Sequence, residues 1–252
     1  MKAIILCAGY ATRLHPLTLD CPKHLLEINN KPILEFIYDK INKISCIDEI
    51  IIVTNNKFYS HFKDWADLVD KNIQVINDNT NNNDERLGGI GDLHFVINKT
   101  KINDDLLIIL GDNFFEFDLK KFVDFAIKIK EVVLGGYEIG DLEEAKRFGV
   151  LKLNEDGRTL VDFQEKPENP SSSLISTGIY FFPKKEIKLI QDYMRTNENK
   201  DGPGYLIKYL YPRQNVFVYV FKEPWYDIGS LEQYKFLQEK YKNDIFQTKT
   251  FK

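Results

Sequence analysis

A loop of small residues that directly follows an apolar N-terminal run is the first place where this sequence could do chemistry. The loop begins at Ala8 and Gly9, after residues 3–7, and leads to Arg13 and then to Lys23. Backbone N–H groups in such a loop can face phosphate oxygens, and a helix that starts nearby adds its positive end. A guanidinium suits a polyphosphate because it donates in a fixed fork, and a lysine adds a compact charge. The same residues are equally compatible with a turn that carries surface cations.

Two aspartates stand where a carboxylate could hold a divalent cation. Asp112 follows the apolar run 106–110, and Asp227 lies between Tyr226 and Ile228. Magnesium prefers oxygen ligands and usually joins one or two carboxylates to substrate phosphates. Each aspartate alone can also cap a helix or form a turn, although an acid within an apolar strand needs a partner.

The elements that must position these residues alternate along the first half of the chain. Short β-branched apolar runs, typical of strands buried on both faces, occupy residues 3–7, 50–53, 73–76, 106–110, 132–135, 175–182 and 216–221. Helical periodicity places apolar residues on one face of 33–44 and of 119–129. This alternation predicts an α/β fold with an open sheet, in which ligands bind at the carboxyl ends of the strands. The loops after Leu6, Ile76 and Leu110 are therefore the expected binding sites.

The second half of the chain changes character. An Asp-Gly pair within residues 154–158 separates the apolar runs 149–153 and 160–165, which predicts a hairpin. The Asn-rich stretch 77–86 is interpreted as a loop whose start contacts a ligand and whose tip is solvated.

Composition excludes some classes of protein. The net charge is -4, and Lys and Arg are spread along the 252 residues, so the chain lacks the basic patch of a nucleic-acid-binding protein. Its three cysteines show no metal-ligand spacing, and an odd, scattered set suits a reducing compartment. No apolar stretch reaches the length of a membrane span, and the N-terminal run is too short for a signal peptide. We therefore expect a cytoplasmic protein with no nucleic-acid or membrane partner.

Five segments in a fixed order make the sequence similar to a known family. The stretch 8–23 resembles the signature loop of the sugar-1-phosphate nucleotidylyltransferases, G-G-x-G-T-R-L-x-P-L-T followed by P-K, with Ala8 and Ala11 in place of two glycines. The other segments are Gly111-Asp112-Asn113, Gly149-Val150 with Glu165-Lys166-Pro167, Thr177-Gly178-Ile179-Tyr180, and Trp225-Tyr226-Asp227-Ile228-Gly229. The nearest likeness is to the short glucose-1-phosphate thymidylyltransferase and uridylyltransferase type. If Ala11 needs a positive φ, its side chain costs about 1 kcal/mol.

The resemblance implies a fold and a division of the chain. The fold is a three-layer, Rossmann-like open mixed sheet flanked by helices, of the nucleotide-diphospho-sugar transferase type. We expect a single domain over residues 1–243, with a nucleotide-binding part at about 1–130 and a sugar-phosphate-binding part at about 131–230. The polar tail 244–252 is expected to be frayed.

The resemblance also implies a reaction, in which a nucleoside triphosphate and a sugar 1-phosphate give a nucleotide sugar and pyrophosphate. It places Mg²⁺ on Asp112 and Asp227. Catalytic roles fall on Arg13, Lys23, Asp112 and Lys166. Nucleotide contacts fall on Ala8, Gly9, Tyr10, Ala11, Thr12, Arg13, Asn77, Gly89 and Asp112. Sugar-phosphate contacts fall on Asn113, Gly149, Glu165, Lys166, Thr177, Tyr180 and Trp225.

The identity of the base and two rival functions stay open. Asn77 occupies roughly the place of a glutamine that reads a pyrimidine, which favours dTTP or UTP. One rival is a cytidylyltransferase that acts on phosphocholine, and segments 165–167 and 177–180 argue for a sugar instead. The other is a catalytically idle sensor that binds nucleotide sugars, against which the full set of charged site residues argues. A dinucleotide-binding dehydrogenase is set aside because G-x-G-x-x-G does not follow the first strand. A homo-oligomer is compatible with the resemblance, but no residue here specifies one.

Overall fold

The apolar runs of the first half form the parallel centre of a mixed sheet. The computed structural model describes residues 1–196 and 198–242. The parallel strands are β1 (Lys2–Leu6), β4 (Glu49–Thr54), β5 (Gln74–Asn77) and β6 (Leu106–Leu110), in the spatial order β5-β4-β1-β6. Alternate residues of β1 enter two different cores, Ala3 and Ile5 on one face and Ile4 on the other. This explains why the strands are apolar throughout.

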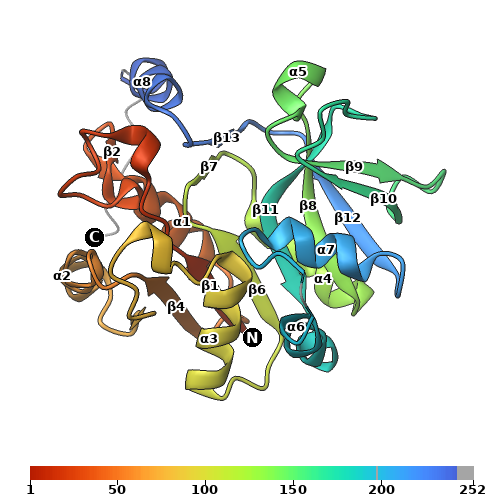
Figure 1. Cartoon of the computed structure of the whole chain (residues 1–252), viewed down its shortest axis with the longest axis horizontal. Helices are drawn as coiled ribbons and strands as arrows, with labels where there is room; N and C mark the ends of the chain where they lie inside the picture. The colour runs from red at the N-terminus through yellow and green to blue at the C-terminus, as the bar shows by residue number, and fades with distance from the viewer. Residues whose placement is uncertain (197, 243–252) are drawn as a thin grey trace.

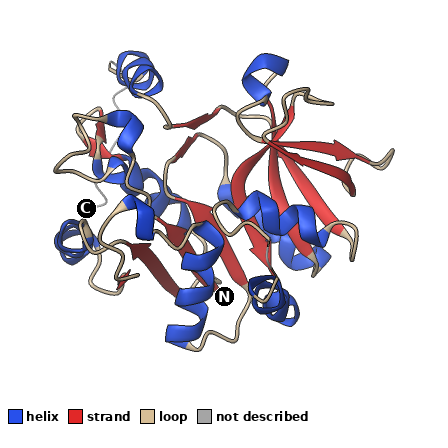
Figure 2. Ribbon diagram, viewed as in Figure 1, coloured by secondary structure: helices blue, strands red, loops and turns tan. Residues whose placement is uncertain are grey.

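The second half extends the same sheet with mostly antiparallel pairs (Figure 2). Strand β11 (Leu174–Phe182) pairs with β6 and with β9 (Gly149–Leu153) along one edge and with β8 (Val132–Glu138) along the other. Strand β12 (Val216–Phe221) pairs in parallel with β8. Strand β10 (Leu160–Glu165) forms the predicted hairpin with β9, and Gly157 in its turn has a φ of 66°. The β11–β6 pairing therefore carries the sheet across both halves.

Helices cover both faces of the sheet, as Figure 1 shows. One face packs on α1 (Ile33–Ile41), α2 (Tyr59–Val69) and α4 (Leu119–Ile129). The other face packs on α3 (Gly89–Thr100), α6 (Ile187–Met194) and α7 (Pro203–Leu210). These layers confirm the predicted three-layer α/β fold. The expected helix 33–44 ends at Ile41, although Ile44 remains buried in the same core.

Short elements complete the chain, and most of them lie near the carboxyl ends of the central strands. They are η1 (Thr12–Leu14), η2 (Lys23–Leu25), β2 (Glu27–Ile28), β3 (Lys31–Pro32), η3 (Asn83–Glu85), β7 (Asn113–Phe115), α5 (Leu142–Ala145), η4 (Lys184–Glu186), β13 (Trp225–Asp227) and α8 (Leu231–Lys240). A third, smaller core ties several of them together, with Leu14, Phe114, Ile228 and Leu237 among its members.

Membrane-spanning helices and the C-terminal tail are the two remaining features that the sequence raises. No helix within the described residues is long and apolar enough to cross a membrane. The tail expected to be frayed, 244–252, lies outside the described residues.

Candidate active site

The loop after β1 has an unusual backbone conformation at Ala11. Ala11 lies in the left-handed region at φ 49° and ψ 41°, so this position does require a positive φ. The hydroxyl of Thr18, which is fully buried, donates to the Ala11 carbonyl at 2.8 Å and holds this turn. Gly9 and Arg13 are exposed, whereas Tyr10 is buried, with its hydroxyl 3.2 Å from that of Thr80. Thr12 begins the one-turn helix η1 that carries Arg13.

The carboxyl ends of β1 and β6 lie so close together that the segments following the two strands are in contact. A Cβ on Gly111 would lie 2.4 Å from Cys7 Sγ, so only glycine fits there. The next residue, Asp112, thereby reaches Lys23, and its Oδ2 lies 2.5 Å from Lys23 Nζ.

In this ion pair, the attraction between opposite charges outweighs the effect of burial on the pKa of each group. Burial lowers the pKa of Lys23, but Asp112 and Asp227 outweigh this effect and raise it overall. Burial likewise raises the pKa of the Asp112 carboxyl, and the ammonium of Lys23 more than reverses that shift. Burial and the charge of Lys23 lower the pKa of the neighbouring His24 to about 3, so this buried imidazole adds no charge.

A two-stranded ribbon brings the second aspartate to the same place. Strands β7 and β13 are antiparallel, and Asp227 stands opposite Asn113. The Ile228 N–H donates to the Asp112 carbonyl at 3.0 Å and locks the two segments together. Burial and the charge of Asp112 raise the pKa of Asp227 to about 6, while Lys23, Arg147 and Lys166 oppose this shift. The two carboxylates thus lie close enough to repel each other.

These residues fit a magnesium ion. Two mutually repelling carboxylates form a hard oxygen donor set, and a divalent cation between them would relieve the repulsion. No cluster of three or more His, Cys, Asp or Glu side chains suited to a metal occurs within the described residues.

The ends of β9 and β10 place the predicted sugar-phosphate residues beside this site. Gly149 stands opposite Glu165, and the Lys166 N–H donates to the Phe148 carbonyl at 3.0 Å. Lys166 itself has a positive φ of 46°. The Glu165 carboxylate lies against the first turn of α7, where a Cβ on Gly204 would be only 1.9 Å from its Oε2. Burial raises the pKa of Glu165.

A buried amide group lies between the two parts. The Trp225 indole N–H donates to Asn113 Oδ1 at 3.0 Å. Because the indole can only donate, this bond fixes the orientation of the amide. Asn113 Nδ2 is buried and has no hydrogen-bond partner within the described residues. It lies next to Gly178, where a Cβ would be 3.2 Å away.

The remaining predicted sugar residues are more enclosed. The Thr177 hydroxyl donates to the Gly135 carbonyl at 3.1 Å, and the side chain is 1% exposed. The ring of Tyr180 packs in the core, with its hydroxyl 3.4 Å from Ser176 Oγ. Each of these two hydroxyls already takes part in a hydrogen bond within the protein, so a ligand could contact it only alongside that bond.

The predicted base-reading groups already have partners within the protein. Asn77 donates to Asn56 Oδ1 at 2.8 Å and accepts from the Asn79 N–H at 2.8 Å. The Gly89 N–H donates to the Asp201 carbonyl at 2.6 Å. The Asn-rich loop is buried near its start, at Asp78 and Thr80, and exposed over 81–87. Its solvated tip agrees with the interpretation of the sequence.

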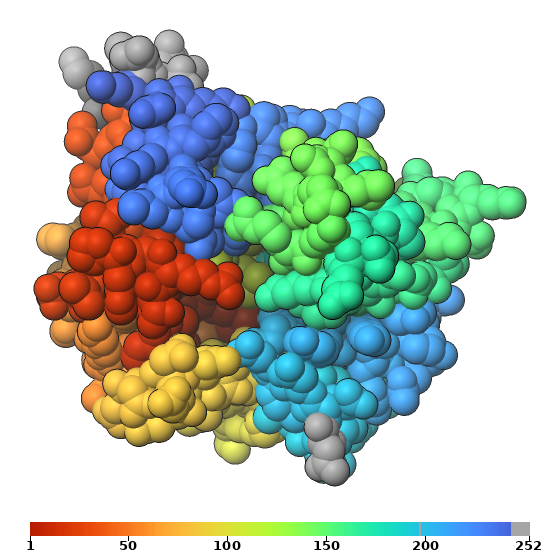
Figure 3. Space-filling view, turned by 45° about the horizontal axis from the view of Figure 1, so that its top comes forward, coloured from red at the N-terminus to blue at the C-terminus, as the bar shows by residue number. Residues whose placement is uncertain are grey.

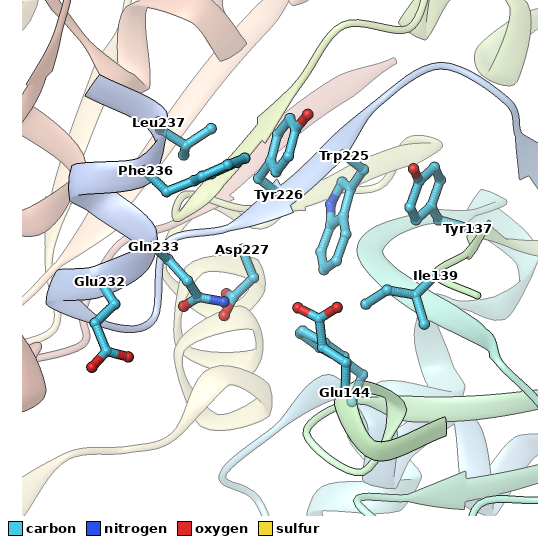
Figure 4. Close-up of a pocket in the computed structure, with 11 residues that line it drawn as sticks. Tyr137, Ile139, Glu144, Trp225, Tyr226, Asp227, Glu232, Gln233, Phe236 and Leu237 are labelled. Carbon is cyan, nitrogen blue, oxygen red and sulfur yellow. The ribbon is translucent and has the colours of Figure 1, made fainter. Parts of the chain in front are cut away.

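A hollow opens between the two parts, visible in Figure 3 between the N-terminal segment (red), α3 (yellow), α5 (green) and α8 (blue). Beside it, a cavity of about 480 Å³ has Asp227 in its wall. Figure 4 shows Trp225 and Glu144 across this cavity from Gln233 and Asp227.

Sequence reasoning missed two groups that shape the site. Arg147 lies 3.8 Å from Asp227 Oδ2, measured from its Nη2, and Gly204 makes room for Glu165. Arg147 comes two residues before the Gly149-Val150 segment, and Gly204 stands in a Gly-Pro-Gly run at the start of a helix. Neither pattern alone indicates a partner that is distant in sequence.

Comparison with known proteins places the chain in a family. A sequence profile of the nucleotidyl transferase family matches residues 2–244. The bifunctional protein GlmU of Methanocaldococcus jannaschii is 32% identical over 254 residues, which cover 97% of this chain and 56% of that protein. A glucose-1-phosphate adenylyltransferase of Fusobacterium nucleatum is 28% identical over 249 residues, which cover 92% of this chain and 64% of that protein. The chain therefore spans less than two thirds of the length of these relatives.

A solved structure has the same fold. A UDP-glucose pyrophosphorylase in complex with UDP-glucose superposes with a TM-score of 0.80 and 20% identity, over 96% of this chain and 98% of that one. The family profile covers nearly the whole chain, so the protein belongs to the nucleotidyl transferase family. This confirms the family that the five segments indicate.

Proposed function

We propose that this protein transfers a nucleotidyl group from a nucleoside triphosphate to a sugar 1-phosphate and releases pyrophosphate. The observation that carries the proposal is the meeting of Lys23, Asp112 and Asp227 where the two parts of the chain join. Lys23 belongs to the first part, Asp227 to the last, and β7 and β13 connect them.

The loop of residues 8–13 would hold the triphosphate. Its exposed Gly9 leaves the backbone open, because no atom of the described residues, apart from the two chain neighbours, lies within 4 Å of a Cβ placed there. Arg13 would neutralise the pyrophosphate side, where charge grows as the bond to the α-phosphorus breaks. Lys23, which pairs with Asp112, would stabilise the α-phosphate oxygens.

The sugar 1-phosphate would bind on the opposite side of the aspartates. Lys166 would hold its phosphate, and Glu165 would accept hydrogen bonds from sugar hydroxyls. The Nδ2 of Asn113 would donate to a sugar oxygen, which satisfies a buried group that otherwise lacks a partner.

Transfer then needs no nucleophile from the protein. A phosphate oxygen of the sugar 1-phosphate attacks the α-phosphorus in line, and pyrophosphate leaves with the electron pair of the broken bond. The side chains contribute positioning and charge stabilisation. Magnesium, held by Asp112 and Asp227, would supply further neutralisation of the phosphate oxygens.

We further propose that the base is a pyrimidine, in dTTP or UTP. Asn77 ends β5 at the sheet edge where α/β proteins bind ligands, and its amide can pair with thymine or uracil in exchange for its bond to Asn56. Relatives differ in the base that their names state, so this choice is a proposal about this chain alone.

The test is pyrophosphate release with Mg²⁺, measured over five nucleoside triphosphates and a panel of sugar 1-phosphates, with phosphocholine included. We expect release with one sugar phosphate and with dTTP or UTP. Release only with CTP and phosphocholine would assign the protein to the rival cytidylyltransferases. Binding of nucleotide without any release would make it an idle binder.

A further inference from the structure

Arg147 reaches from the end of α5 toward α8 and the metal-binding carboxylate. Its Nη2 donates to Gln233 Oε1 at 3.0 Å, and the same nitrogen lies 3.8 Å from Asp227 Oδ2. Its side chain is 43% exposed, compared with 22% for that of Asp227. The guanidinium is therefore a partly solvated group that can move without disturbing the core.

A glycine makes this arrangement possible. The Gly229 N–H donates to Gln233 Oε1 at 3.1 Å. A Cβ at this position would lie 2.6 Å from Asp227 Oδ2 and 3.6 Å from Arg147 Nη2. The Gln233 amide, the Asp227 carboxylate and the Arg147 guanidinium thus all lie close to Gly229. Figure 4 shows Gln233 beside Asp227.

Each of the two carboxylates proposed to hold magnesium therefore has its own cation. Lys23 pairs with Asp112 at 2.5 Å, and Arg147 stands by Asp227 at 3.8 Å. A cation beside a carboxylate competes with any metal ion that needs the same oxygens. Lys166 adds a third positive charge to the same region.

We propose that Arg147 is the counter-ion that Mg²⁺ displaces from Asp227, and that the released guanidinium then donates to a phosphate of the bound substrates. This inference rests on the proposed nucleotidyl transfer. It deepens that proposal by giving Arg147 two alternating anionic partners. The exchange costs little because Arg147 is partly exposed and bonded to a neutral amide, and a planar guanidinium suits phosphate oxygens.

The test uses the full chain and measures binding, with no turnover required. Mn²⁺ replaces Mg²⁺ as the probe, and its affinity is measured by titration calorimetry without nucleotide for the unaltered chain and for R147Q. Removal of the competing charge tightens Mn²⁺ binding by about two- to fivefold, the range set by a partly exposed ion pair. A second titration, with pyrophosphate in the presence of Mg²⁺, shows weaker binding to R147Q.

Two further variants separate the exchange from a general effect of charge or folding. K146Q removes a positive charge from the adjacent residue, whose ammonium pairs with Glu143 at 2.7 Å, and leaves Mn²⁺ affinity unchanged. R147K keeps the charge at the site and keeps the Mn²⁺ affinity of the unaltered chain.

The Mn²⁺ titration tests the displacement of Arg147 from Asp227, and the pyrophosphate titration tests its contact with phosphate. Unchanged or weaker Mn²⁺ binding by a folded R147Q would overturn the exchange, as would the absence of Mn²⁺ binding by the unaltered chain. Unchanged pyrophosphate binding would overturn the second step. Active nucleotidyl transfer together with either negative result would leave the proposed function standing and remove only this inference.

Discussion

Lys23 Nζ lies 2.5 Å from Asp112 Oδ2, although the two residues are 89 positions apart in the chain. The contact exists because β1 and β6 are neighbours in register, and because Gly111 lets the β6 end approach Cys7. It joins a cation that suits phosphates to a carboxylate that suits a metal.

Replacement of Asp112 by asparagine should abolish turnover and leave the fold intact. The substitution removes one carboxylate proposed to hold the metal ion and the negative partner of Lys23, so we expect a loss of more than about a hundredfold in kcat. Circular dichroism checks the fold, and pyrophosphate release checks the rate. D124N, at an exposed aspartate paired with Lys120, is the control. Near-normal activity of D112N would show that the metal assignment is wrong.

Removal of the Lys166 side chain should weaken the binding of one substrate, the sugar 1-phosphate. We expect K166A to raise the KM for sugar 1-phosphate by about tenfold or more, with little change for the nucleotide, because a charge-assisted phosphate contact is lost. Steady-state kinetics with each substrate varied in turn measure this. K152A, at an exposed position on the neighbouring strand β9, should change neither value. An effect confined to the nucleotide would place Lys166 at the other substrate.

A methyl group at Gly204 should displace Glu165. The added Cβ would lie 1.9 Å from Glu165 Oε2, and the end of that flexible side chain can move away without unfolding the helix. The same Cβ would lie 3.1 Å from the buried ring of Phe163, which must give slightly. We therefore expect G204A to stay folded with a small loss of melting temperature and to raise the KM for sugar 1-phosphate by about tenfold. G202A is a close control because its Cβ would stand 3.8 Å from Glu165 Oε1. Equal kinetics for the two variants would remove Glu165 from the sugar site.

Glycine at position 11 should stabilise the protein. Ala11 has a φ of 49°, where a Cβ costs about 1 kcal/mol, although the greater freedom of glycine in the unfolded chain offsets part of the gain. We expect A11G to add about 0.5 kcal/mol to the free energy of unfolding, measured by urea denaturation. A66G, within α2, should lose about 1 kcal/mol or more. Destabilisation by A11G would mean that the Cβ of Ala11 makes packing contacts worth more than its strain.

The buried pair of Asp78 and Asp92 should make stability depend on pH. Burial, the charge of Asp78 and a hydrogen bond with it raise the pKa of Asp92 from 3.8 to about 8. The folded state therefore keeps a proton that the unfolded state releases above pH 3.8, so stability falls as pH rises from about 4 to about 8. The asparagine of D92N cannot ionise, so its stability relative to the unaltered chain should increase over this range. Parallel urea unfolding curves at pH 5 and pH 8 test this, and an equal pH dependence of the two proteins would contradict it.

The sequence predicts the sheet well because strands buried on both faces leave unbroken apolar runs. β6, β9, β10 and β12 begin and end where the pattern places them. Strands β7 and β13 have three residues each, which is too short for any periodicity, yet their pairing brings Asp227 to Asp112. The resemblance supplied that pair, whereas residue patterns alone left each aspartate as a metal ligand, a cap or a turn.

Other features of the site depend on contacts between distant segments, which local patterns do not contain. The Gly89 N–H donates to the Asp201 carbonyl, and the missing side chain of Gly204 leaves space for Glu165. Arg147 lies near Asp227 in a fold that places α5 and α8 on either side of the cavity. The fold decides which of the polar groups in a motif remain available to a ligand.

We propose that this chain joins a nucleotide to a sugar phosphate at the Asp112–Asp227 site. The most direct measurement follows a nucleoside triphosphate labelled at its α-phosphate, incubated with Mg²⁺, a hexose 1-phosphate and either the unaltered chain or D112N. We expect the label to enter a nucleotide sugar with one pyrophosphate released per transfer, and we expect D112N and removal of Mg²⁺ each to stop this. Label that stays in the triphosphate for every sugar phosphate tested, or transfer that D112N sustains, would contradict it.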